Sequence, residues 1–214
     1  MHGKIAGIRK NYSKKKLTET KANPDPFKQF AKWWKQSLES EIVEPNAMTL
    51  ATSSADGFPS ARIVLLKGFD EKGFVFFSNY ESFKGKQLQE NPRACIVFFW
   101  KEVERQVRIT GIVEKLQETE SEKYFHSRPE ESQLGAVVSP QSRVIESRDW
   151  LDEQYKTLKK EMKGKVVPRP VNWGGYLIKP VLFEFWQGRP GRLHDRLQYS
   201  PGENGNWKIE RLAP

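Results

Sequence analysis

The segment 192–196 carries an unusual set of ionisable side chains. Its sequence is Arg-Leu-His-Asp-Arg, and an extended backbone would place Arg192, His194 and Arg196 on one face of a strand. Three positive or nearly positive groups on one face repel one another unless an anion lies over them. The pattern therefore indicates either an anion-binding face or an ordinary solvated basic face, and the spacing alone leaves both open.

A second group of residue types suited to an anion is Tyr124, Arg128 and Ser132, which follow one another at intervals of four. An arginine can make bidentate charge-assisted bonds, hydroxyls add donors, and a helix that restarts after Pro129 offers unpaired backbone N–H groups. This combination suits a phosphate, although a row of polar residues on a helix surface has the same spacing. The run 62–67 has a cation at each end of an apolar stretch, which fits either a grip on a ligand at a barrel rim or simple strand ends.

Familiar cofactor and metal motifs are absent from the sequence. It contains no GxGxxG, Walker A, HExxH or paired CxxC motif, and its three histidines are scattered, so we expect no dinucleotide, P-loop or metal site. The single cysteine, Cys95, excludes an internal disulfide and favours a reducing cytoplasm. The longest apolar runs reach only seven residues, where a membrane span needs about 20, and no signal peptide is expected.

The net charge of +9 raises the question of a nucleic-acid partner. Residues 1–25 hold seven Lys or Arg and two acidic residues, a balance of +5, which leaves +4 for the other 189 residues. Phe and Trp fall mainly on apolar runs and not among exposed basic residues. We therefore expect no nucleic-acid partner, a mobile basic arm over 1–25 and one folded domain over 26–214.

The elements that must position these groups are short strands around a helical insert. A helix is expected from Pro26, capped by Asp25, with an apolar face made of Phe27, Phe30, Ala31, Trp34 and Leu38. Further helices are expected at 82–90 and over 118–163, the latter broken at Pro129 and near Pro140. Strands are expected at 48–53, 60–67, 74–78, 94–100, 106–116, 173–178, 182–187, 194–199 and 207–212. Many short strands without βαβ alternation favour a closed or split antiparallel barrel over a Rossmann fold.

Taken together, these segments resemble the pyridoxine 5′-phosphate oxidase family over nearly the whole chain, from about residue 9 to residue 214. The most specific match is Phe-Glu-Phe-Trp-Gln at 183–187 followed by Arg-Leu-His-Asp-Arg at 192–196. Further agreement, in the family's order, lies at 62–67, 104–107, 124–129, 141–142 and 207–214. Chance convergence does not account for so many separated matches.

The resemblance implies a mostly β fold with helices (α+β), namely an FMN-binding split β-barrel that is antiparallel, Greek-key-like and carries a helical insert. It implies a cytoplasmic homodimer that holds each flavin between subunits. The implied reaction is the oxidation of pyridoxine 5′-phosphate or pyridoxamine 5′-phosphate by O2 to pyridoxal 5′-phosphate and H2O2, with ammonia released from the amine. This is the last step of vitamin B6 cofactor synthesis and salvage, and it needs no metal.

The resemblance also implies roles for individual residues. Arg192 and His194 would lie over the pyridine ring as the catalytic pair, and Arg9 and Tyr12 of the arm would close over the substrate. The substrate phosphate would be held by Lys67, Tyr124, Arg128 and Ser132. FMN would be contacted by Arg62, Ile63, Val64, Leu65, Leu66, Lys67, Phe77, Ser78, Lys84, Gln106, Gln141, Ser142, Trp186 and Arg196.

One residue departs from the family's pattern. Where the family usually has an Arg that contacts the FMN phosphate, this chain has Phe83, so we expect FMN to bind about ten- to a hundredfold more weakly unless Lys84 or Lys86 compensates. Two other functions fit many of the same residues. Another FMN split-barrel oxidoreductase, such as a flavin reductase, would use 62–67 but gives no reason for the Tyr124, Arg128 and Ser132 group. A non-enzymatic FMN or pyridoxal phosphate carrier would use the same cations without turnover.

Overall fold

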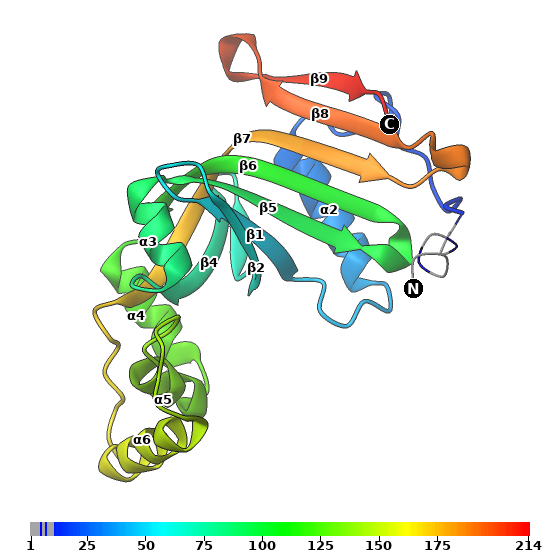
Figure 1. The fold of residues 1–214 in the computed structure, drawn as a ribbon. Coiled ribbons are helices and arrows are strands. Elements are labelled where there is room, and N and C mark those ends of the chain that lie inside the picture. Colours follow the sequence, from blue (N-terminus) through cyan, green and yellow to red (C-terminus); the bar gives the residue numbers. More distant parts are fainter. Residues whose placement is uncertain (1–4, 6, 8–10) are drawn as a thin grey trace. The chain divides into compact units, whose positions relative to one another are not determined.

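The computed structural model describes residues 5, 7 and 11–214 of the chain. Its helices and strands follow one another as α2 (Pro26–Leu38), β1 (Ala47–Ser53), β2 (Pro59–Leu65), β3 (Gly68–Asp70), β4 (Gly73–Asn79), α3 (Phe83–Glu90), β5 (Arg93–Trp100), β6 (Arg105–Lys115), α4 (Glu118–Ser127), α5 (Glu130–Val138), α6 (Arg148–Glu161), β7 (Trp173–Gln187), β8 (Asp195–Pro201) and β9 (Trp207–Leu212) (Figure 1). The strands form one nine-stranded sheet in the order β2-β1-β5-β6-β7-β4-β3, with β8 paired to β7 and β9 paired to β8. The predicted mixture of antiparallel strands with a helical insert between β6 and β7 is therefore present.

The chain divides into two compact units. Unit 1 comprises Met1–Leu50, Cys95–Gly111 and Pro180–Pro214, and unit 2 comprises Ala51–Ala94 and Ile112–Lys179. Each unit has buried aromatic and aliphatic side chains of its own, so each is described separately.

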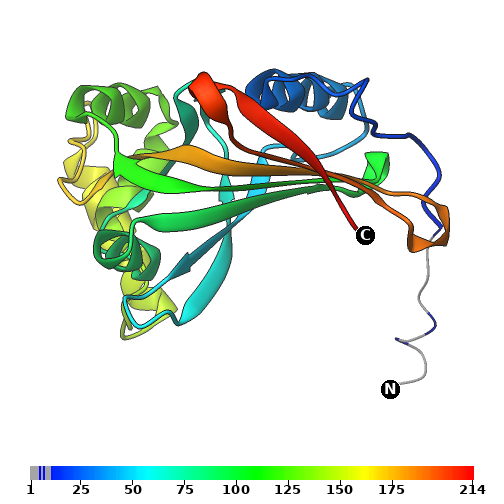
Figure 2. The ribbon, with the colours of Figure 1, turned by 90° about the horizontal axis from the view of Figure 1, so that it is seen from above.

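Unit 1 is organised around helix α2 and the strands that it packs against (Figure 2). The helix begins as predicted, because the Asp25 carboxylate accepts the backbone N–H groups of Phe27 and Lys28 and Pro26 occupies the first turn. Trp33 meets Phe185 of β7 edge-on at 5.2 Å. The predicted apolar face is partly wrong. Phe30 is buried as predicted, and Trp33, which was not predicted, is buried with it. Trp34 is half-buried, and Ala31 and Leu38 are exposed, so the buried face is turned toward Trp33.

Unit 2 combines the hairpin of β3 and β4 with the helices α4, α5 and α6. Strand β4 pairs antiparallel with the first part of β7, in a register that sets Phe76 opposite Tyr176. The helices close over a small core of Phe125, Leu134, Val167 and Trp173. Gly174 lets this part of β7 lie against Tyr80, because a Cβ there would lie 2.0 Å from the Tyr80 hydroxyl oxygen.

Two strands, separated between residues 178 and 182, were predicted where the structure has the single strand β7. It runs unbroken through Pro180, since its segment 173–178 pairs with β4 and its segment 183–187 pairs with β8. Pro180 lies between those two segments, so its missing N–H breaks no bond to either strand. Among the described residues, no helix is long and apolar enough to cross a membrane, and no group of His, Cys, Asp or Glu is placed to hold a metal ion.

Candidate functional site

The largest concentration of predicted site residues lies around a cavity of about 510 Å³ in unit 2. This volume is in the range usual for small-molecule sites. The cavity is lined by residues from β2, β4, the start of α3 and the α4–α5 region, namely Arg62, Ile63, Val64, Leu65, Lys67, Phe77, Ser78, Lys84, Tyr124, Arg128, Pro129, Ser132, Gln141 and Trp173. All but Pro129 and Trp173 were expected from the sequence to contact a ligand.

The charged side chains in the described wall of this cavity are all positive. Arg62, Lys67, Lys84 and Arg128 line it, and no Asp or Glu stands among the described residues that form its wall. Burial, and then the neighbouring charge of Arg62, lower the pKa of Lys84 to about 8. The Lys84 ammonium donates to Ser78 Oγ at 3.2 Å and to Gln141 Oε1 at 3.0 Å. Because these two partners are neutral, the positive charge of Lys84 is available to an anion that enters the cavity.

Arg128, which lines the cavity, keeps one donor without an acceptor among the described residues. Its Nη2 donates to the Ser132 carbonyl at 2.7 Å, and its guanidinium lies over the Trp173 ring at 4.6 Å. Its Nη1 is buried and has no hydrogen-bond partner in the part of the chain that the structure describes. Burial also lowers the pKa of Arg128. A buried guanidinium nitrogen without an acceptor costs free energy, which a bound phosphate oxygen would recover.

Three aromatic rings among the lining residues stack on one another. Phe77 stacks on Tyr124 with ring centroids 3.8 Å apart, and on Trp173 at 5.6 Å, with interplanar angles of 20° and 15°. Parallel rings beside a cluster of cations can accommodate a flat, negatively charged ligand.

Most of the other predicted residues that the structure describes belong to unit 1, where an aromatic cluster forms around His194. The Trp186 and His194 ring centroids are 4.6 Å apart, and Tyr12 contacts both rings, at 5.6 Å and 5.9 Å. Gly188 permits this contact, because a Cβ there would lie 2.6 Å from Tyr12 Cβ. Tyr12 of the arm thus meets two residues more than 170 positions away in sequence.

The expectation that Arg192, His194 and Arg196 share one strand face is wrong. Strand β8 begins only at Asp195, and Arg192 closes a short 3₁₀ turn with φ of +63°. Pro190 and Gly191 start that turn, which breaks the period of two that the pattern requires. Arg192 is exposed at the turn, while Arg196 lies opposite Trp186 in the β7–β8 pair.

His194 is held as a neutral donor. Its Nδ1 accepts the backbone N–H of Arg189 at 3.1 Å, which leaves the ring proton on Nε2. Burial, assisted by the charge of Arg192, lowers the pKa of His194. At neutral pH, Arg192 therefore carries the positive charge and His194 offers an N–H.

Arg196 is oriented by a buried carboxylate. Its Nε donates to Glu184 Oε1 at 2.8 Å, and Arg108 Nη2 donates to the other Glu184 oxygen at 2.5 Å. Glu184 is only 3% exposed. The bond from Glu184 raises the pKa of Arg196 and fixes the direction of its remaining N–H groups.

Two carboxylates hold the described part of the arm in unit 1. Glu104 Oε2 accepts the backbone N–H groups of Ser13 at 2.8 Å and Lys14 at 3.0 Å. Asp195 Oδ2 accepts the backbone N–H of Leu17 at 3.0 Å. These bonds anchor the chain directly after Tyr12. The predicted mobility of the arm remains a prediction.

Three predicted residues line neither the cavity nor the aromatic cluster: Leu66 is buried, Gln106 is half-buried on β6, and Ser142 is exposed with φ of +70° beside Gln141. Arg9 is outside the described residues. Sequence reasoning missed Trp173 and Glu104. No local pattern marks them, because each acts on residues distant in sequence, although Glu104 belongs to the segment 104–107 that was singled out.

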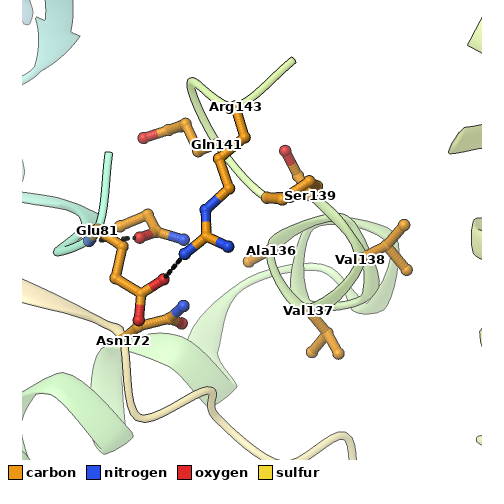
Figure 3. Close-up of a pocket in the computed structure, with 10 residues that line it drawn as sticks. Glu81, Ala136, Val137, Val138, Ser139, Gln141, Arg143 and Asn172 are labelled. Carbon is orange, nitrogen blue, oxygen red and sulfur yellow. Dashed lines mark hydrogen bonds and ion pairs between the residues drawn. The ribbon is translucent and has the colours of Figure 1, made fainter. Parts of the chain in front are cut away.

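A second, smaller cavity of about 180 Å³ lies in unit 2 beside the end of α5. Figure 3 shows Arg143 pointing at Glu81, and the two form an ion pair at 2.6 Å. Because this charge is already paired and Gln141 is the one predicted ligand residue in the wall, the cavity is a weaker candidate for the anion site.

Comparison with known proteins gives the family that the chain matches. Residues 35–159 match the family described as pyridoxamine 5′-phosphate oxidase, and residues 173–214 match the pyridoxine 5′-phosphate oxidase C-terminal dimerisation region. A curated relative, the pyridoxine/pyridoxamine 5′-phosphate oxidase of Gloeothece citriformis, is 57% identical over 214 residues, which cover 100% of both chains.

Two solved structures share the fold. The crystal structure of PhzG from Burkholderia lata, in complex with tetrahydrophenazine-1-carboxylic acid, has a TM-score of 0.88 at 29% identity and covers 94% of this chain and 100% of its own. A pyridoxamine 5′-phosphate oxidase-related, FMN-binding protein from Nostoc punctiforme has a TM-score of 0.71 at 16% identity and covers 90% of this chain and 100% of its own. The expected α+β fold of the split-barrel type is thereby confirmed.

Proposed function

Because the chain belongs to the pyridoxamine 5′-phosphate oxidase family, we propose that the cavity of unit 2 binds FMN together with the phosphate of a B6 vitamer. The family makes the protein an FMN-dependent oxidase of pyridoxine or pyridoxamine 5′-phosphate. The observation that carries the placement is the cavity itself, which combines four cations, no carboxylate among the described wall residues and three stacked aromatic rings.

The residues present suit FMN. Its phosphate needs cationic and hydroxyl donors, which Arg62, Lys84 and Ser78 supply, and its ring system needs a flat apolar surface. The orphaned Arg128 Nη1 is a further donor for a phosphate. When bound, FMN supplies the ring that accepts a hydride from the substrate and passes the electrons on.

The substrate phosphate is assigned to Lys67, Tyr124, Arg128 and Ser132. These side chains bring two cations and two hydroxyls to the same cavity wall. They anchor the vitamer by its phosphate, so that its ring and the carbon to be oxidised are held in one orientation.

Arg192 and His194 are assigned to the pyridine ring. His194 would donate from Nε2 because its Nδ1 is already bonded to the Arg189 N–H, and Arg192 would add a cation beside the ring that holds it in place for the hydride transfer. Tyr12, which contacts His194, would cover the ring and exclude water.

We further propose that O2 is the electron acceptor. Pyridoxine 5′-phosphate and O2 then give pyridoxal 5′-phosphate and H2O2, whereas pyridoxamine 5′-phosphate, O2 and water give the same products with ammonia. A cytoplasmic location remains a prediction.

We also propose a homodimer whose active site takes the unit 2 cavity from one subunit and the Tyr12, Trp186 and His194 cluster from the other. The C-terminal match to a dimerisation region supports it, as do Ile63 and Phe99, large apolar side chains that are 64% and 54% exposed on β2 and β5.

Mixing two inactive variants tests this arrangement. Arg128→Ala and Arg192→Ala chains, unfolded and refolded together, would place both defects in one site of each mixed dimer and leave the other site intact. With random pairing, about a quarter of the parental H2O2 production with pyridoxine 5′-phosphate should return. No recovery would mean that each site is built from a single chain, and no H2O2 from the parent would refute O2 as acceptor.

A further inference from the structure

The guanidinium of Arg62 is held by two hydroxyl groups on the strands beside it. Its Nη1 donates to Thr52 Oγ1 at 2.6 Å, and its Nη2 donates to Ser60 Oγ at 2.7 Å. Thr52 lies on β1 and is buried, while Ser60 and Arg62 share the same face of β2. The two bonds fix the orientation of the guanidinium plane at the cavity wall.

The direction of these bonds requires one more partner. A guanidinium can only donate, so each hydroxyl oxygen accepts from Arg62 and must pass its own hydrogen to a different acceptor. Both hydroxyls reach the same atom, Gln87 Oε1, at 2.6 Å from Thr52 and 2.7 Å from Ser60. Gln87 comes from helix α3 and is 3% exposed. Its carbonyl therefore ends a chain of hydrogen bonds that begins at Arg62.

The opposite orientation of the Gln87 amide does not fit. With Nε2 toward the hydroxyls, each oxygen would face two donors, and the two hydroxyl hydrogens would lose their common acceptor. In the observed orientation Nε2 is buried without a partner among the described residues. A buried donor left open is a cost to stability, so stability alone does not explain an amide at this position.

We propose that Gln87 is a positioning residue that sets the Arg62 guanidinium for FMN without contacting the cofactor. It acts through Thr52 and Ser60 and through the longer bond that Arg62 Nη2 donates directly to Gln87 Oε1 at 3.5 Å. The inference rests on the assignment of Arg62 to FMN under the proposed function. It adds that the affinity for FMN depends on a buried amide that does not line the cavity.

Substitution of Gln87 tests the proposal, with FMN binding to the apoprotein as the readout. Gln87→Leu keeps the size of the side chain but removes the acceptor, so both hydroxyls can rotate and Arg62 loses its fixed direction. We expect FMN to bind about five- to tenfold more weakly, measured by quenching of flavin fluorescence. Gln89→Leu is the matched control, because Gln89 lies on the same helix but is exposed, and it should leave FMN affinity unchanged.

A double-mutant cycle separates positioning from a general effect on folding. Arg62→Met should weaken FMN binding by itself, and adding Gln87→Leu to it should weaken binding no further, because Gln87 acts only through Arg62. Thr52→Val, which removes the acceptor of Nη1, should resemble Gln87→Leu, and the two should not add.

The outcomes distinguish the inference from its premise. If Arg62→Met binds FMN like the parent, the assignment of Arg62 fails and the positioning role fails with it. If Arg62→Met is weakened but Gln87→Leu is not, the assignment stands and the inference is overturned. Additive losses from Arg62→Met and Gln87→Leu would also overturn it, because Gln87 would then act by another route.

Discussion

The low pKa of Lys84 predicts that FMN binding weakens at moderately alkaline pH. Burial and the charge of Arg62 lower this pKa to about 8, so that the free protein has about nine-tenths of Lys84 protonated at pH 7 and about one-tenth at pH 9. A phosphate monoester is a dianion over this whole range, since its second pKa is about 6. Binding of the dianion favours protonated Lys84, so the dissociation constant should rise about tenfold between pH 7 and pH 9.

The assay is a fluorescence titration of apoprotein with FMN at several pH values and constant ionic strength. Lys84→Arg keeps its charge throughout and should give a flat profile, while Lys84→Met should bind weakly and also lose the tenfold change. Changes that originate in the flavin or elsewhere in the protein would appear equally in Lys84→Met. The reasoning is refuted if the parent and Lys84→Met show the same dependence on pH.

Three further predictions follow from individual residues. Phe83 is 57% exposed at the first position of α3, beside Lys84. Phe83→Arg should tighten FMN binding about tenfold in the same titration. An unchanged affinity would mean that this position does not face the phosphate. Arg192→Ala should keep its flavin spectrum and lose about 2 to 4 kcal/mol of transition-state stabilisation in kcat/KM, whereas turnover like the parent's would exclude Arg192 from the reaction. Glu104→Ala removes the acceptor for two backbone N–H groups of the arm and should speed tryptic cleavage after Lys14 by about tenfold or more. Glu102→Ala serves as the control. Equal cleavage rates in the two variants would show that Glu104 does not anchor the arm.

The sequence predicted correctly the features that depend only on residues close together in the chain. Asp25 and Pro26 start α2 as expected, since a cap and a proline act within one turn. The alternation of 192–196 suggested an extended strand, but Pro190 and Gly191 begin a 3₁₀ turn that reaches Arg192. The strands predicted at 173–178 and 182–187 form one strand, because the segments on either side of Pro180 pair with different partners, and a single sequence does not reveal this.

The sequence predicted most of the residues that line the cavity of unit 2, but not how those residues are arranged in space. The spacing of Tyr124, Arg128 and Ser132 suggested one helix face, yet α4 ends at Ser127 and α5 restarts at Glu130, and the three still line one cavity because the break at Pro129 turns the chain around it. The bonds from Ser13 to Glu104 and from Thr52 to Gln87 join residues 91 and 35 positions apart. Such pairings follow from strand register and packing, which a single sequence does not specify.

The arginines at the proposed site differ in whether a buried carboxylate pairs with them. The described wall of the unit 2 cavity has cations and no carboxylate, so its positive charge is available to a phosphate. In unit 1 the charge of Arg196 is offset by Glu184, which it shares with Arg108, so Arg196 can contribute directed N–H groups but little net attraction. Arg196→Ala should therefore weaken FMN retention in a way that excess FMN restores, and it should also lower the melting temperature of the apoprotein, because Glu184 keeps only one partner. Arg62→Met should lower FMN affinity without that loss of stability, and equal melting temperatures for Arg196→Ala and the parent would show that Glu184 needs no second arginine.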